Sequence, residues 1–93
     1  MNALNHYSIK VHGKVQGVFF RASARSQAEE LGIKGTVKNE QDGSVFIEAE
    51  GDSESLRIFL EWCHKGPDRA RVDKVEAEEG PLQNFSEFKV TRS

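Results

Sequence analysis

The chain has 93 residues, 37 % of them hydrophobic and 30 % charged, with a formal net charge of −2, which is typical of one small folded domain with a single core over residues 1–93. The slightly acidic balance disfavours nucleic-acid binding, no apolar run approaches the roughly 20 residues of a membrane-spanning helix, and the single cysteine excludes an internal disulfide and a cysteine-based zinc site. We therefore expect a cytoplasmic monomer with neither a nucleic-acid nor a membrane partner.

The first part of the chain predicts a strand, a helix and a hairpin. Apolar and polar residues alternate over residues 6–12, which indicates a strand with one buried face. Small and apolar residues then recur at helical spacing over residues 21–31, and Gly32 is a suitable stop. Residues 35–39 have an extended pattern, and the tight-turn pair Asp42-Gly43 follows them before another alternating run. Together these two segments predict a hairpin.

The second part predicts a helix and two strands. Asp52 or Ser53 caps a helix whose apolar stripe ends at Cys63, which we expect to be a buried structural thiol. A strand is expected over residues 71–78, where the apolar residues do not hold one phase, and this predicts a bulge or a twisted start. A short strand over residues 88–90 completes the order β-α-β-β-α-β plus a terminal strand. This is the ferredoxin-like α+β pattern, an antiparallel sheet of four to five strands with two helices on one face.

The turn between the first strand and the first helix has the composition of a phosphate-binding loop. Backbone N–H groups at a helix N-terminus, a glycine-containing loop and an arginine on the first helical turn can together surround an anion. The guanidinium adds a planar fork that matches two phosphate oxygens. Taken alone, the pattern fits an ordinary strand-to-helix turn better. The candidate phosphate-binding residues are Val15, Gln16, Gly17, Val18, Phe19, Phe20 and Arg21.

Asn39 is the second candidate, at the end of the short strand before the hairpin turn. If this strand lies beside the glycine-containing loop, the amide of Asn39 could hold a water molecule near a bound phosphorus. An amide donates and accepts hydrogen bonds, so it can orient water, but it takes no proton at neutral pH. Taken by itself, Asn39 fits a residue that shapes the turn before Asp42-Gly43 better than a water-binding residue.

Together, the two segments resemble the acylphosphatase signature, and the similarity extends over nearly the whole chain. They read Gly13-x-Val15-Gln16-Gly17-Val18-x-Phe20-Arg21 and Gly35-x-Val37-x-Asn39-x-x-Asp42-Gly43-Ser44-Val45. The resemblance implies an enzyme that hydrolyses the carboxyl–phosphate bond of acyl phosphates, in which Arg21 binds the substrate phosphate and Asn39 orients the hydrolytic water. Thr36 departs from the pattern, since many members carry a bulky aromatic there, and this bears on local packing rather than on chemistry.

An acyl phosphate is a substrate that one arginine, one asparagine and a few backbone N–H groups could hydrolyse. Its leaving group is a carboxylate with a pKa near ~4.3, which departs without being protonated. We therefore expect direct in-line attack by water with no metal and no cofactor, and inorganic phosphate as product and competitive inhibitor. The alternative is a ferredoxin-like module that binds a phosphate-bearing ligand without turnover. An RNA-recognition-type domain would need stacking aromatics in a Lys/Arg-Gly-Phe/Tyr motif, and a metal chaperone would need Cys-x-x-Cys; the sequence has neither.

Overall fold

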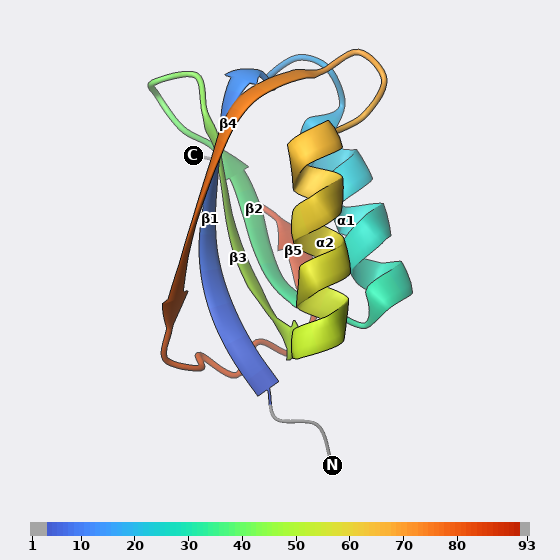
Figure 1. Ribbon diagram of the computed structural model, residues 1–93, viewed down its shortest axis with the longest axis vertical. Helices are drawn as coiled ribbons and strands as arrows, with labels where there is room; N and C mark the ends of the chain where they lie inside the picture. The colour runs from blue at the N-terminus through green and yellow to red at the C-terminus, as the bar shows by residue number, and fades with distance from the viewer. Residues whose placement is uncertain (1–3, 92–93) are drawn as a thin grey trace.

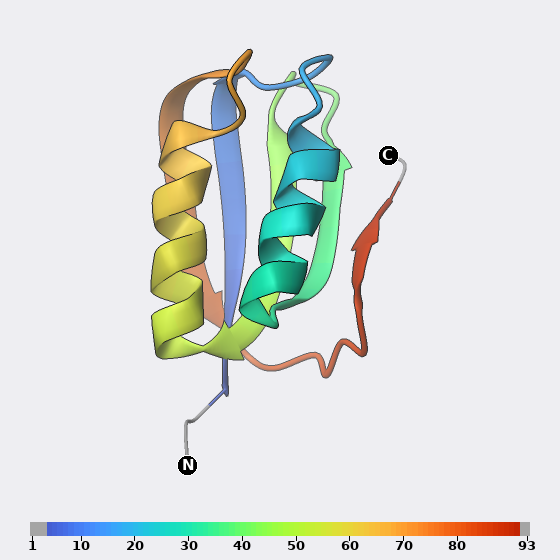
Figure 2. The same cartoon turned by 90° about the vertical axis from the view of Figure 1, so that its right-hand side faces the viewer.

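The computed structural model describes residues 4–91, and within them the helices and strands follow the predicted order. They are β1 (Leu4–Lys14), α1 (Phe20–Leu31), β2 (Lys34–Asn39), β3 (Val45–Asp52), α2 (Ser53–Lys65), β4 (Arg71–Gly80) and β5 (Phe88–Val90). Both helices cover the same face of the sheet (Figure 1) and lie side by side across it (Figure 2). The predicted ferredoxin-like arrangement is confirmed.

The sheet is mixed, whereas the sequence pattern predicted an antiparallel one. Its strand order is β4-β1-β3-β2-β5, and the pairs β1–β4, β1–β3 and β2–β3 are antiparallel. Strand β5 pairs parallel with β2, with Phe88 opposite Gly35 and Val90 opposite Val37. The reason is the connection after β4, which runs past the lower ends of the strands, as drawn in Figure 2, to the opposite edge of the sheet before β5 begins. The last strand therefore enters in the same direction as β2.

The predicted irregularity at the start of β4 is a bulge. His12 pairs with Lys74, but the next residue, Gly13, pairs with Val72, so Asp73 is the extra residue of the bulged strand. Gly13 has a φ of 132°, and a Cβ there would lie 2.1 Å from the carbonyl oxygen of Arg71. Only glycine fits so close an approach, and the bulge thereby sets the direction in which the chain leaves β1 for the loop that follows.

The core lies between the sheet and the two helices, and it includes Cys63, which is fully buried as predicted. Helix α2 begins after Asp52, whose carboxylate accepts a hydrogen bond from the Ser55 N–H at 2.8 Å. Helix α1 begins at Phe20, one residue earlier than the apolar spacing predicts. Neither helix of residues 4–91 is long and apolar enough to cross a membrane.

Candidate active site

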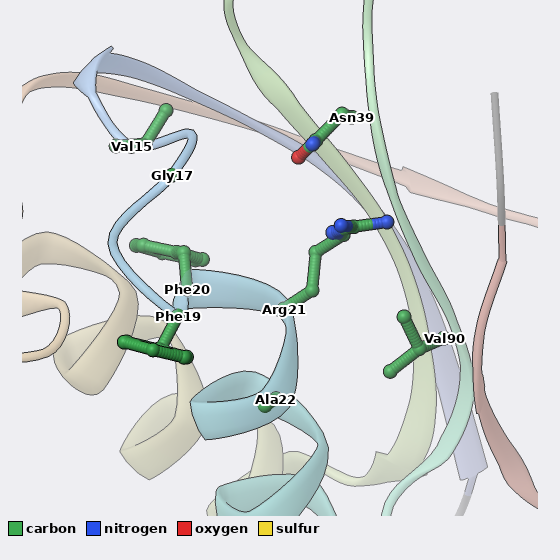
Figure 3. Close-up of a pocket in the computed structure, with 8 residues that line it drawn as sticks. All are labelled: Val15, Gly17, Phe19, Phe20, Arg21, Ala22, Asn39 and Val90. Carbon is green, nitrogen blue, oxygen red and sulfur yellow. The ribbon is translucent and has the colours of Figure 1, made fainter.

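A pocket of about 340 Å³ opens where the loop after β1, the first turn of α1 and the end of β2 meet (Figure 3). It is lined by Val15, Gly17, Phe19, Phe20, Arg21, Ala22, Asn39 and Val90. The structure thus brings both halves of the sequence motif to one place. The side chains of Gln16 and Val18 do not line this pocket, which leaves only their backbone groups for the predicted phosphate contacts. Ala22 and Val90 are additions that the sequence analysis missed.

The backbone of residues 15–20 is bent in the way that anion-binding loops are. Gly17 and Phe19 have φ values of 74° and 63°, in the left-handed region, while the residue between them does not. Alternation of left-handed and other conformations turns successive N–H groups toward one side and forms a concavity that attracts anions. The loop can therefore offer several N–H donors to one phosphoryl group.

The N-terminus of α1 adds to this attraction because no side chain caps it. Its N-cap residue is Phe19, which makes no capping hydrogen bond, and the first turn holds no acidic residue. The first N–H groups of a helix have no partners within the helix and carry a partial positive charge of about +0.5. In α2 the Asp52 carboxylate supplies the missing acceptor. At α1, a bound anion would do so.

Arg21 and Asn39 approach the pocket from different elements, and Figure 3 shows their polar ends close to one another. Arg21 is half-buried on the first turn of α1, and among residues 4–91 no carboxylate forms an ion pair with it. The Oδ1 atom of Asn39 is buried and accepts no hydrogen bond from any described residue. A buried acceptor without a partner costs about 1–3 kcal/mol, so such atoms usually serve a ligand or water.

The side chain of Gln16 ties the loop to the hairpin that carries Asn39. Its Nε2 donates to the carbonyl oxygens of Glu40 at 2.8 Å and Ser44 at 2.9 Å, the two ends of the turn between β2 and β3. The sequence pattern predicted a role for the backbone N–H of Gln16 but none for its side chain. Its side-chain contact joins residues 24 and 28 positions apart, and no local pattern signals such a bond.

The hairpin turn is held from its other side by Asp42. Its Oδ1 accepts hydrogen bonds from the Ser44 hydroxyl at 2.5 Å and the Ser44 N–H at 3.0 Å, and its Oδ2 lies 3.0 Å from the Lys10 Nζ. The hydrogen bonds from Ser44, and then the contact with Lys10, lower the pKa of the Asp42 carboxyl well below its usual value. The turn therefore keeps this anion, and its shape, through neutral and mildly acidic pH.

The chemical repertoire of the pocket is small. It contains one guanidinium, one amide and backbone N–H groups, with no carboxylate, imidazole or thiol among its lining residues. Nor do any three His, Cys, Asp or Glu side chains of the described residues group closely enough to hold a metal ion. These groups can bind a phosphoryl group and orient a water molecule, and the roles of Arg21 and Asn39 in doing so stay predictions.

The sequence matches the family model of acylphosphatases over residues 7–90. The chain belongs to the acylphosphatase family. An acylphosphatase of Marinobacter nauticus is 49 % identical over 89 residues, which cover 95 % of this chain and 97 % of that relative. The structure of an acylphosphatase from Coxiella burnetii is similar with a TM-score of 0.93 at 43 % identity, covering 97 % of this chain and 94 % of that one. The crystal structure of an acylphosphatase from Bacillus subtilis is similar with a TM-score of 0.92 at 34 % identity, covering 96 % of this chain and 99 % of that one.

Proposed function

We propose that this protein is an acylphosphatase, which hydrolyses acyl phosphates to a carboxylate and inorganic phosphate by direct attack of water at phosphorus. The observation that carries the proposal is the buried Asn39 Oδ1, an acceptor without a partner among residues 4–91 in the same pocket as Arg21. Family membership over nearly the whole chain supports it. A phosphate-binding module without turnover would need the arginine and the loop, but not this amide.

Each group in the pocket has one task in this reaction. The N–H groups of residues 15–20 and the Arg21 guanidinium hold the phosphoryl oxygens, and each charge-assisted hydrogen bond contributes roughly 1.5–3 kcal/mol. Because charge shifts among these oxygens in the transition state, the same contacts lower the barrier. Asn39 accepts a hydrogen bond from the attacking water and so orients it in line with the bond that breaks. The substrate phosphate takes the proton of the water.

Because the pocket lacks a general acid, it favours a substrate whose leaving group departs without a proton. A carboxylate leaves without protonation because its conjugate acid has a pKa near ~4.3, so the pocket needs no general acid. A phosphate monoester expels an alkoxide and hydrolyses far more slowly in water, and the pocket has no acid to assist it. The product phosphate carries the oxygens that the loop and Arg21 bind, and we therefore expect it to inhibit competitively.

A phosphate-release assay with benzoyl phosphate tests the proposal. We expect turnover to continue in the presence of EDTA, because no three His, Cys, Asp or Glu side chains of residues 4–91 are grouped closely enough to hold a metal ion. We also expect added phosphate to inhibit competitively. Phenyl phosphate, a monoester, is the matched control substrate and should release little phosphate. If well-folded protein binds phosphate but releases none from benzoyl phosphate, the non-catalytic binding module is the correct function.

We also propose that residues 1–93 act as one domain, as a cytoplasmic monomer on small-molecule acyl phosphates, with no nucleic-acid or membrane partner. The single core, the net charge of −2 and the absence of a membrane-spanning helix in residues 4–91 support this. Sedimentation equilibrium over a range of concentrations should give the mass of one chain throughout. A mass that rises with concentration would contradict the monomer.

A further inference from the structure

Phe19 is an unusual residue for its position. Its side chain is 75 % exposed, more than any other large hydrophobic side chain of residues 4–91. It also lies at the N-cap of α1 with a φ of 63°, a left-handed conformation that disfavours residues with a Cβ and suits glycine or asparagine. Neither core packing nor backbone geometry therefore explains a phenylalanine at this position, and its exposed benzyl group is free to contact a ligand.

Phe19 belongs to an apolar part of the active-site pocket. Together with Ala22 and Val90, which are also exposed, it lines the pocket and forms what we call the apolar rim. Figure 3 shows Asn39 on one side of the Arg21 guanidinium, with Ala22 and Val90 on the other. Two apolar side chains of the pocket thus lie on the side of the guanidinium that faces away from Asn39.

In-line geometry connects this division to the reaction. The attacking water and the leaving oxygen lie on opposite sides of phosphorus in such a displacement. If Asn39 holds the water, the leaving carboxylate points away from Asn39, toward the side where the rim lies. The acyl group is bonded to that leaving oxygen, so it must extend from the phosphate loop in this direction.

We propose that the apolar rim binds the acyl group, and that the protein prefers acyl phosphates whose acyl group is aromatic or bulky and apolar. This inference rests on the proposed function and names its substrate class. An aryl ring can pack offset or edge-to-face against Phe19, and a pair of this kind contributes a factor of roughly two to ten in binding. An acetyl group has no ring to pack against Phe19.

The test compares benzoyl phosphate with acetyl phosphate in the wild type and in Phe19→Gly. Glycine accepts the left-handed conformation, so the variant should unfold in urea at no lower concentration than the wild type. The ratio of kcat/KM for benzoyl to acetyl phosphate should fall roughly two- to tenfold. Comparing ratios cancels the different intrinsic reactivities of the two substrates. Val90→Thr, which keeps the shape of the side chain, should lower the same ratio by a smaller factor.

Ile58→Ala is the control, since Ile58 is 37 % exposed on α2 and does not line the pocket. It should leave the ratio unchanged. Phosphate release from both substrates with the same ratio in Phe19→Gly as in the wild type overturns the inference alone. Release from neither substrate by folded wild-type protein overturns the proposed function and this inference with it.

Discussion

Asn39 lines the pocket, and its buried amide oxygen has no hydrogen-bond partner among residues 4–91. We therefore expect Asn39→Ala to reduce kcat by about 100-fold or more, because the water loses its orientation. The inhibition constant of inorganic phosphate should stay nearly the same, since the loop and Arg21 are intact. Steady-state kinetics with benzoyl phosphate and added phosphate measure both quantities. A loss of phosphate inhibition in parallel with kcat would contradict the water-positioning role.

Arg21 should behave in the opposite way, with binding and turnover lost together. In Arg21→Lys an ammonium replaces the planar fork, so at least one charge-assisted hydrogen bond to the phosphoryl oxygens is lost. We expect kcat/KM to fall about 10- to 100-fold and the inhibition constant of phosphate to rise by a similar factor. Arg25→Lys is the control on the same helix, because among residues 4–91 Arg25 forms an ion pair only with Glu29, at 3.3 Å, and both side chains are exposed. Equal effects of the two substitutions would contradict this role.

Among single residues, the sequence pointed to Arg21, Asn39 and the loop of residues 15–20, and it missed two apolar residues that also line the pocket. Arg21 and Asn39 stand in motifs with fixed spacing, and the structure places both in the pocket. Val90 could not be predicted there, because it reaches the pocket from β5, after a connection that runs past the end of the sheet from one edge to the other. Ala22 was missed for a simpler reason, since an alanine on a helix carries no chemical signal.

At the level of elements, the relative position of the loop and the hairpin depends on Gln16. We expect Gln16→Met, which removes two donors while keeping the length of the side chain, to lower the free energy of unfolding by about 1–2 kcal/mol. It should also lower kcat, because Asn39 would no longer be held against residues 15–20. Urea unfolding and kinetics with benzoyl phosphate measure the two effects.

Gln83→Met is the matched control for this substitution. Its Nε2 donates to the carboxylate of Glu48 at 3.0 Å in the middle of β3, and neither residue lines the active-site pocket. This variant should lose some stability and keep the wild-type kcat. If Gln16→Met also keeps the wild-type kcat, the bond to the hairpin is structural only.

Local patterns predicted the elements well and the direction of the last strand badly. The turn pair Asp42-Gly43, the cap at Asp52 and the bulge near the start of β4 are all short-range signals, and the structure contains each of them. The parallel pairing of β5 depends instead on how residues 81–87 are held at the end of the sheet, and their side chains show no periodicity. Short sequence patterns therefore could not predict the direction of β5, because it depends on contacts with distant residues.

For the molecule as a whole, the anchor of residues 81–87 is the carboxylate of Glu50. It is 5 % exposed, lies 2.8 Å from the His6 Nδ1, and accepts hydrogen bonds from the N–H groups of Gln83 and, at 3.1 Å, Phe85. Burial raises the pKa of Glu50, but the hydrogen bonds from Gln83, His6 and Phe85 outweigh it and bring the pKa below its usual value. This anchor fixes the connection that leads to Val90 in the pocket.

The anchor makes stability depend on pH with a definite sign. Because the pKa of Glu50 is lower in the folded than in the unfolded chain, its contribution is complete above the unfolded pKa of about 4.3 and is lost as the pH falls through the folded pKa. Glu50→Gln should therefore lower the free energy of unfolding by about 1–3 kcal/mol at pH 7, with a smaller difference near pH 3. Urea unfolding at both pH values checks this, and an equal difference at both would contradict it.

The charge on β4 has a consequence for the protein at high concentration. This ten-residue strand lies at one edge of the sheet, where unpaired backbone groups invite strands of other molecules. Its exposed carboxylates at Glu76, Glu78 and Glu79 repel an identical strand, and the bulge at Asp73 bends the edge. The hydrogen bond from His12 lowers the pKa of Glu76, so part of this repulsion persists in mild acid. Both features oppose the pairing of β4 with the same strand of a second molecule.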